Sequence, residues 1–233
     1  MINNICYYFI IFIIYSFIGW SIEVIGKLIE KHRFINRGFL IGPICPIYGF
    51  GCLAIILLLS KYKSDPIILF FMAIIICSIL EYLTSYIMEK MFHVRWWDYT
   101  RRKFNINGRI CAETMIPFGI LGCFVLYIVN PFFNSILSKI PVMSLNVIAL
   151  IIFLIYLIDN ILSLTIMFGF KGTLKTIEKD GTEEITKEVK EVLLKRNFLY
   201  KRLIKAFPNI KNKNERLEEL KNKINKEIEK IKH

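Results

Sequence analysis

Long apolar runs separated by short charged segments dominate the first 170 residues of this chain. A helix needs about 20 apolar residues to cross the hydrocarbon core of a bilayer. Five runs approach that length, so we expect membrane-spanning helices at about 5–25, 44–60, 67–88, 110–133 and 145–170. Pro46, Gly49 and Gly51 interrupt the start of the second run, which leaves both a complete span and a re-entrant segment open there.

Beyond residue 170 apolar and charged positions mix. Between Glu183 and Phe207 apolar residues recur at three- and four-residue steps among Lys and Arg, and a second such pattern starts at Asn214. We therefore predict an all-α fold: a polytopic transmembrane helix bundle at 1–170 and a cytoplasmic, charged, basic amphipathic helical tail at 171–233. The tail either lies at the headgroup surface or docks onto a cytosolic partner.

Composition agrees with a membrane protein. Hydrophobic residues make up 55% of the chain and the mean hydropathy is +0.50, which argues against a water-soluble enzyme. The formal net charge of +12 is concentrated in short loops and the tail, where anionic lipid headgroups are the expected partner and nucleic acid is not. The six Cys lie in the spans or at their cytoplasmic ends without a Cys-x-x-Cys pair, so we expect no disulfide.

The basic residues also predict orientation. Lys and Arg in short loops stay on the cytoplasmic side during insertion. With five spans, 28 of the 31 basic residues fall on one side of the membrane and three on the other. This distribution places the N-terminus outside and the tail in the cytoplasm, with the chain as a multi-pass protein of the cell membrane.

Acidic side chains inside the spans need an explanation, because each costs at least about 2.5 kcal/mol on insertion. One interpretation pairs them with Arg, hydroxyl or amide groups to stabilise the bundle; the other makes them line a polar path for a cation, a proton or a polar solute. On the third predicted helix, Ser78, Glu81, Thr84, Ser85 and Glu89 share one face. The residues of the predicted polar path are Glu23, Glu81, Glu89, Asp159 and Asn160.

Two predicted cytoplasmic segments carry distinctive residues. The first, from Asn36 to Gly49, is a shaped turn. It forms either a tight re-entry into the second helix or a cradle for an anion. The second, from Phe92 to Cys111, either anchors at the membrane interface through its aromatic residues or forms a cytosolic binding surface. The predicted surface comprises Asn36, Arg37, Gly38, Gly42, Pro43, Cys45, Tyr48, His93, Arg95, Trp96, Trp97, Asp98, Tyr99, Asn105, Asn107 and Arg109.

Catalytic patterns are sparse. The chain has no G-x-x-x-x-G-K-[ST] phosphate-binding loop, and we expect no cofactor, no resident metal and no catalytic set. Two weaker alternatives involve His93: a hydrated metal with Glu89 and Asp98, and a nucleophilic pair with Cys45.

Four ordered motifs resemble a known family. They are SFIGWSIE (16–23), NRGFLIGPICPIYGFG (36–51), LEYLTSYIMEKMFHVRWWDY (80–99) and FNINGRIC (104–111). Together they resemble bacterial membrane proteins classed as ABC-transporter permeases of type IV, the CmpB-like family, over about residues 5–170. AETMIPFG after Cys111 departs from the longer apolar form expected there, so Glu113 is less secure as a family feature.

The resemblance implies an ABC-transporter-like permease subunit whose ATPase is a separate cytosolic chain, and it implies no particular substrate. We add the polar path between helices to this prediction. Two alternatives stay open: a membrane-embedded enzyme acting on a lipid or prenyl-phosphate through Asp98, His93 and Arg109, and a non-transporting regulatory or assembly subunit that acts through its tail. The sequence leaves a homo-oligomer open.

Overall fold

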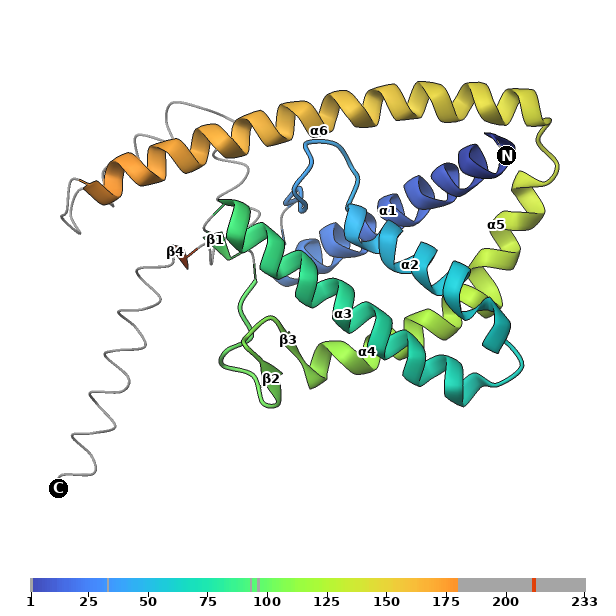
Figure 1. The fold of residues 1–233 in the computed structure, drawn as a ribbon, viewed down its shortest axis with the longest axis horizontal. Coiled ribbons are helices and arrows are strands. Elements are labelled where there is room, and N and C mark those ends of the chain that lie inside the picture. The colour runs from blue at the N-terminus through green and yellow to red at the C-terminus, as the bar shows by residue number, and fades with distance from the viewer. Residues whose placement is uncertain (1, 33, 93, 96, 180–210, 213–233) are drawn as a thin grey trace.

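The computed structural model describes residues 2–32, 34–92, 94–95, 97–179 and 211–212. Within these ranges the chain is mostly helical, with four very short strands (Figure 1). The elements are α1 (Ile2–Lys31), α2 (Pro46–Leu59), the 3-10 turn η1 (Ser60–Tyr62), α3 (Pro66–Phe92), β1 (Val94–Arg95), β2 (Asn105–Ile106), β3 (Ile110–Cys111), α4 (Ala112–Phe124), the π-helical turn η2 (Val125–Val129), α5 (Asn130–Leu137), α6 (Val142–Lys179) and β4 (Lys211–Asn212).

Four helical segments of the described chain are long and apolar enough to cross a membrane. They are Ile5–Glu30, Pro66–Phe92, Ala112–Leu137 and Val142–Phe168. The third of these joins α4, η2 and α5 into one continuous segment. The predicted helix bundle is therefore confirmed, and four of the five predicted spans correspond to these segments to within a few residues.

The second predicted span corresponds to a shorter helix. α2 and η1 together cover only Pro46–Tyr62, and the preceding residues 34–45 are not helical. Pro46 occupies the first turn of α2, where its missing N–H costs no helical hydrogen bond. The positive φ of +115° at Gly38 places the backbone in a conformation that side-chain-bearing residues rarely adopt. A bent, non-helical segment therefore precedes a helix that is shorter than the four membrane-length segments.

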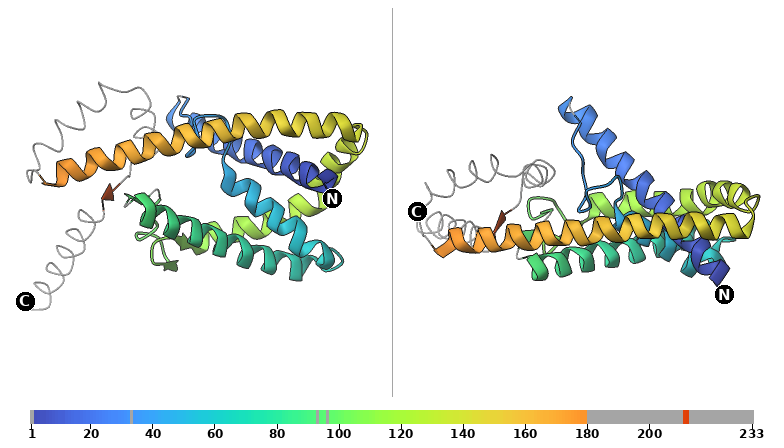
Figure 2. Two further views of the ribbon diagram at one scale, coloured as in Figure 1. Left: turned by 45° about the horizontal axis from the view of Figure 1, so that its top comes forward. Right: turned by 90° about the horizontal axis from the view of Figure 1, so that it is seen from above.

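The helices run alternately along one long axis. α1, α3 and α6 run in one direction, whereas α2 and the α4–α5 segment run in the other (Figures 1 and 2). α1 and α2 lie between α6 on one side and the α3–α4 pair on the other (Figure 1). The start of α1, the α2–α3 turn and the α5–α6 turn meet at one end, which we call the N-terminal end; the 34–45 segment and the strands lie toward the other.

Apolar and polar buried residues separate along this axis. The apolar core occupies the half nearer the N-terminal end; among its residues are Ile11, Tyr15, Ile55, Leu59, Leu69, Ala73 and Leu126. Most buried polar side chains of the described chain lie in the opposite half: Ser78, Glu81, Ser85, Arg95, Arg109 and Ser163. The fold thus has one apolar half and one half with polar groups inside it.

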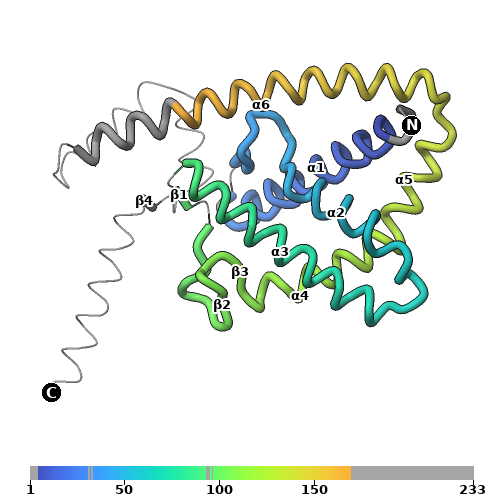
Figure 3. Tube along the Cα trace, in the orientation of Figure 1, coloured from blue at the N-terminus to red at the C-terminus, as the bar shows by residue number. Residues whose placement is uncertain are grey.

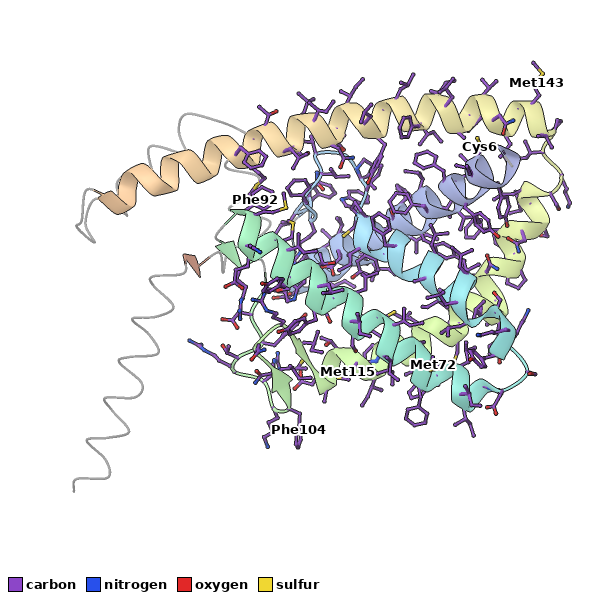
Figure 4. The ribbon with its side chains drawn as sticks, in the orientation of Figure 1. Cys6, Met72, Phe92, Phe104, Met115 and Met143 are labelled. Carbon is purple, nitrogen blue, oxygen red and sulfur yellow. The ribbon has the colours of Figure 1, made fainter. Side chains whose placement is uncertain are left out.

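A small hairpin closes the polar half. β2 and β3 pair antiparallel around Asn107 and Gly108, whose φ angles are +53° and +65°, and the N–H of Arg109 donates to the carbonyl of Ile106 at 3.0 Å. Asn-Gly favours this kind of tight turn. Phe104, 85% exposed, points away from the helices beside it (Figure 4). β1 pairs antiparallel with β4, which brings residues 211–212 beside the connector that follows α3.

Two predictions about the tail fall largely outside the described residues. α6 continues to Lys179, past the predicted end of the fifth span at 170. The amphipathic helices predicted at 183–207 and from 214 onward lie outside the described residues, and so does most of the segment on which the regulatory alternative rests.

Candidate functional site

The segment before α2 reaches across the bundle to α6. It arches toward that helix before α2 begins (Figure 3). The backbone N–H groups of Ile41 and Gly42 donate to the two carboxylate oxygens of Asp159 on α6, both at 2.9 Å. Ser163, one turn further along α6, donates to the same carboxylate at 3.1 Å. Asp159 therefore holds the backbone of this non-helical segment, as buried backbone groups require within a bilayer.

The side chain of Asn36 links the same segment to α1. Its side-chain oxygen accepts the indole N–H of Trp20 at 2.7 Å, and its amide nitrogen donates to the carbonyl of Ile41 at 2.8 Å. The N–H of Cys45 donates to the carbonyl of Ser16 at 3.0 Å. Residues 36–45 are thereby tied to α1 and α6, as a tight re-entry into α2 requires.

Glu23 on α1 is paired on two sides. Arg37 lies 3.3 Å from its carboxylate, and the hydroxyl of Tyr48 donates to it at 2.7 Å. Tyr48 packs on Gly19, where a Cβ atom would lie only 2.1 Å from the tyrosine ring. The absence of a side chain at Gly19 lets the Tyr48 ring lie directly against α1, with its hydroxyl at Glu23.

Glu81 on α3 differs from the other acids. It is 8% exposed, and one oxygen accepts the hydroxyl of Tyr99 at a long 3.4 Å. The other oxygen, Oε2, has no hydrogen-bond partner among the described residues. The hydroxyl of Thr114 faces this carboxyl group but donates to the carbonyl of Cys111 at 2.9 Å.

Tyr99 lies between the two acids. Burial, and next the negative charge of Glu81, raise the pKa of the Tyr99 hydroxyl well above its ordinary value; Glu23 adds to this effect. Tyr99 therefore stays neutral at physiological pH and keeps its proton to donate. We call Glu23, Arg37, Tyr48, Glu81 and Tyr99 the Glu23–Glu81 cluster.

Glu89 forms a separate, charge-balanced network two turns along α3. Its carboxylate lies 3.0 Å from Arg95 and 2.8 Å from Arg109. Arg95 also lies 3.5 Å from Asp98, and Arg109 donates to Ser85 at 3.1 Å. Both guanidinium groups are buried, so they bind the hairpin to α3 instead of facing solvent. The described contacts of Asp98 and Arg109 accordingly give no support to the enzyme alternative.

The remaining predicted site residues make local contacts. Trp97 donates to the carbonyl of Arg109 at 3.0 Å, and Asn107 donates to the hydroxyl of Tyr82 at 2.9 Å. Asn105 accepts the N–H of Gly108 within the turn, and Asn160 donates to the carbonyl of Tyr156 in its own helix. Pro43 belongs to the non-helical segment before α2. His93 and Trp96 lie outside the described residues.

Sequence reasoning separated residues that the fold brings together. Arg37 and Tyr48 were assigned to a cytoplasmic surface, yet they contact Glu23 of the predicted path. Two buried hydroxyls were absent from the predicted site: Ser16 and Ser78, 0% and 6% exposed, lack a hydrogen-bond partner within the described part of the chain. The polar face of α3 included Ser78, but nothing in the sequence indicated that its hydroxyl would be buried without a partner.

The described residues contain no group of three or more His, Cys, Asp or Glu side chains arranged to hold a metal ion. The alternative of a metal at Glu89, His93 and Asp98 includes a residue outside that part of the chain. Glu89, for its part, is engaged by two arginines.

Comparison with known families agrees with the motifs. The model of the family described as "Putative ABC-transporter type IV" matches residues 10–164. The chain belongs to this family. The match contains the whole Glu23–Glu81 cluster and also Asp159, so these residues lie within the family domain. No curated protein and no solved structure matches the chain.

Proposed function

We propose that this chain is the membrane subunit of an ABC-type transporter, and that a polar path runs between α1, α2 and α3 past the Glu23–Glu81 cluster. Family membership and the four membrane-length helices support the transporter. The chain has no nucleotide-binding loop, so ATP hydrolysis belongs to a separate cytosolic chain.

The carrying observation is the buried Oε2 of Glu81, which has no hydrogen-bond partner within the described ranges. Intramembrane acids are expensive and are retained where they pair structurally or line a path. Glu23, Glu89 and Asp159 have close partners in Arg37, in two arginines and in two backbone amides. Among the described residues, Glu81 has the long bond from Tyr99 and the nearby hydroxyl of Thr114, and no cation acts on it. Pairing that stabilises the bundle therefore accounts for Glu23, Glu89 and Asp159. Glu81 is the acid that supports a polar path.

The polar residues indicate where such a path would run. Glu23 is one-third exposed and Glu81 is buried, and the charge of each acid influences Tyr99 between them. Ser78 lies one turn beyond Glu81 on α3, on the side of the apolar core. The proposed path thus leads from the hairpin end to the middle of the bundle and meets the apolar core there.

The test compares solute fluxes in cells that lack the gene with fluxes in cells that carry the wild-type chain, Glu81→Gln or Glu113→Gln. Glu113 is a matched control, because it is 59% exposed and pairs with Arg102 away from the cluster. We expect a flux in a panel of labelled cations, amines and polar solutes that needs the chain, is lost in Glu81→Gln and is kept in Glu113→Gln. An unchanged panel after gene deletion would refute the proposal.

A second measurement tests the partner. The tagged full-length chain, solubilised in mild detergent, should retain a cytosolic ATPase whose activity follows the chain through purification. Repeated purification without any ATPase would contradict the assignment as an ABC-type subunit.

A further inference from the structure

We propose that Glu81 is a proton-binding site, which binds and releases a proton inside the bundle, whereas Glu23, Glu89 and Asp159 are held by close partners. This inference rests on the proposed transporter function and names the ion that its path handles. It also gives Glu81 a different role from Glu23, Glu89 and Asp159, although the sequence analysis placed all four acids in one polar path.

Burial is the first step of the argument. Glu81 is 8% exposed and lies eight residues from Glu89 on α3, which corresponds to about 12 Å along the helix. Water therefore has little access to its carboxyl group in this conformation. An ionised carboxylate in such surroundings is strongly disfavoured unless a cation or several hydrogen bonds compensate it.

Charge compensation is the second step. The described groups that act on the Glu81 carboxyl group are Tyr99, Thr114 and Glu23, and none of them is a cation. Arg37, the nearest cation of the cluster, is already paired with Glu23 at 3.3 Å. Tyr48 on α2, Cys77 on α3 and Cys111 on β3 are neutral donors or thiols. The cation Arg109 donates to Ser85, one turn from Glu81 on α3, but it is paired with Glu89 at 2.8 Å. A proton on Glu81 removes the uncompensated charge.

Hydrogen bonding is the third step. Oε2 of Glu81 has no hydrogen-bond partner among the residues that the structure describes, and Tyr99 already donates to Oε1. The Ser78 hydroxyl, one turn away on the same face, also lacks a partner among the described residues. A carboxylic acid has a hydrogen to donate, whereas a carboxylate can only accept. The protonated form thus suits a site that already supplies donors and has no counter-charge.

Access is the fourth step. Glu23 is one-third exposed at the hairpin side of the cluster, and the apolar core begins on the other side with residues such as Ile55 and Leu69. Proton exchange in this conformation therefore occurs with water at the hairpin end: the carboxylic acid releases its proton to water and takes one back. Exchange with the N-terminal end requires the apolar core to open.

A hydrophobic carbodiimide tests the proposal, because it modifies carboxyl groups that are protonated and lie in apolar surroundings. The full-length chain is treated with dicyclohexylcarbodiimide in membranes over a series of pH values, and the adducts are located by mass spectrometry. We expect modification of Glu81 that falls about tenfold per pH unit once the group ionises. Glu89 and Glu113, which are paired with arginines, should stay unmodified near neutral pH, and Glu81→Gln should abolish the adduct.

Infrared spectroscopy gives a readout that does not depend on reagent access. The spectrum of wild type minus Glu81→Gln should contain the carbonyl stretch of a protonated carboxylic acid near neutral pH. A carboxylate band in its place, together with an unmodified Glu81, would overturn the proposal. Protection from the carbodiimide by sodium chloride, but not by choline chloride at equal pH, would also overturn it, because a metal cation would then occupy the site.

These measurements are independent of transport. A flux that needs Glu81 without any sign of a protonated carboxyl group would refute the proton site and leave the transporter standing. If Glu81 is protonated but deletion of the gene changes no flux, the transporter function is refuted and the proton site stands.

Discussion

The carboxylate of Asp159 on α6 accepts the backbone N–H of Gly42 at 2.9 Å, although 117 residues separate the two in the chain. This contact fixes the non-helical segment before α2 against a helix from the far end of the family domain. A Cβ atom at position 42 would lie 2.8 Å from the Asp159 carboxylate, so a larger residue there would have to displace that carboxylate.

Replacing Gly42 with alanine should displace the segment from Asp159. The added methyl group overlaps the carboxylate oxygen, so we expect a loss of about 1–3 kcal/mol in the free energy of unfolding. Unfolding of the purified chain in mixed detergent and dodecyl sulfate micelles measures this. Gly26→Ala is the control, because nothing lies within 4 Å of its Cβ position on α1, and it should be neutral or stabilising. Equal effects of the two changes would contradict the contact.

Neutralising Glu89 should be more damaging than neutralising an exposed acid. Glu89→Gln leaves the buried guanidinium groups of Arg95 and Arg109 without their shared carboxylate, at a cost of about 3–5 kcal/mol. The exposed Glu113–Arg102 pair contributes about 0–1 kcal/mol, so Glu113→Gln should be nearly silent. The same micelle unfolding assay compares them. A small effect of Glu89→Gln would mean that the hairpin is not held by this network.

Ionisation of Tyr99 should make the fold less stable at alkaline pH. Its pKa is raised in the fold, so the unfolded chain loses the phenolic proton first as pH rises. The contribution is complete below the ordinary tyrosine value of about 10 and declines above it, up to the raised value in the folded chain. Above that pH, the melting temperature of the wild type should therefore fall more steeply with rising pH than the melting temperature of Tyr99→Phe. Parallel curves for the two proteins would argue against a buried Tyr99 hydroxyl.

The two ends of the bundle should label from opposite sides of the membrane. Phe104 and Met143 are 85% and 81% exposed and lie at opposite ends (Figure 4). In a background with all six Cys replaced, we expect Phe104→Cys to react with an impermeant maleimide only in inverted vesicles. Met143→Cys should react in intact cells. The reverse pattern would invert the orientation predicted from the basic residues.

The bundle itself was predictable from the sequence, because the length of an apolar run and the absence of charge within it are local properties. The interruption at α2 was also visible in Pro46 and the neighbouring glycines. The tight turn at Asn107 and Gly108 carried a local signal as well, although we interpreted Asn107 as part of a surface. Local chemistry therefore determined the elements and several of their ends.

The partners of the polar residues were not predictable in this way. The sequence alone determined that acids lie within apolar helices, and it offered pairing and a path as equal explanations. Tertiary structure decided between them for each acid: it brought Arg37 to Glu23, two arginines to Glu89 and backbone amides to Asp159, and it left one oxygen of Glu81 without a described partner. The physical reason is that compensation of a buried charge depends on which distant groups lie within a few ångströms, and the packing of the helices and of their connecting segments controls that distance.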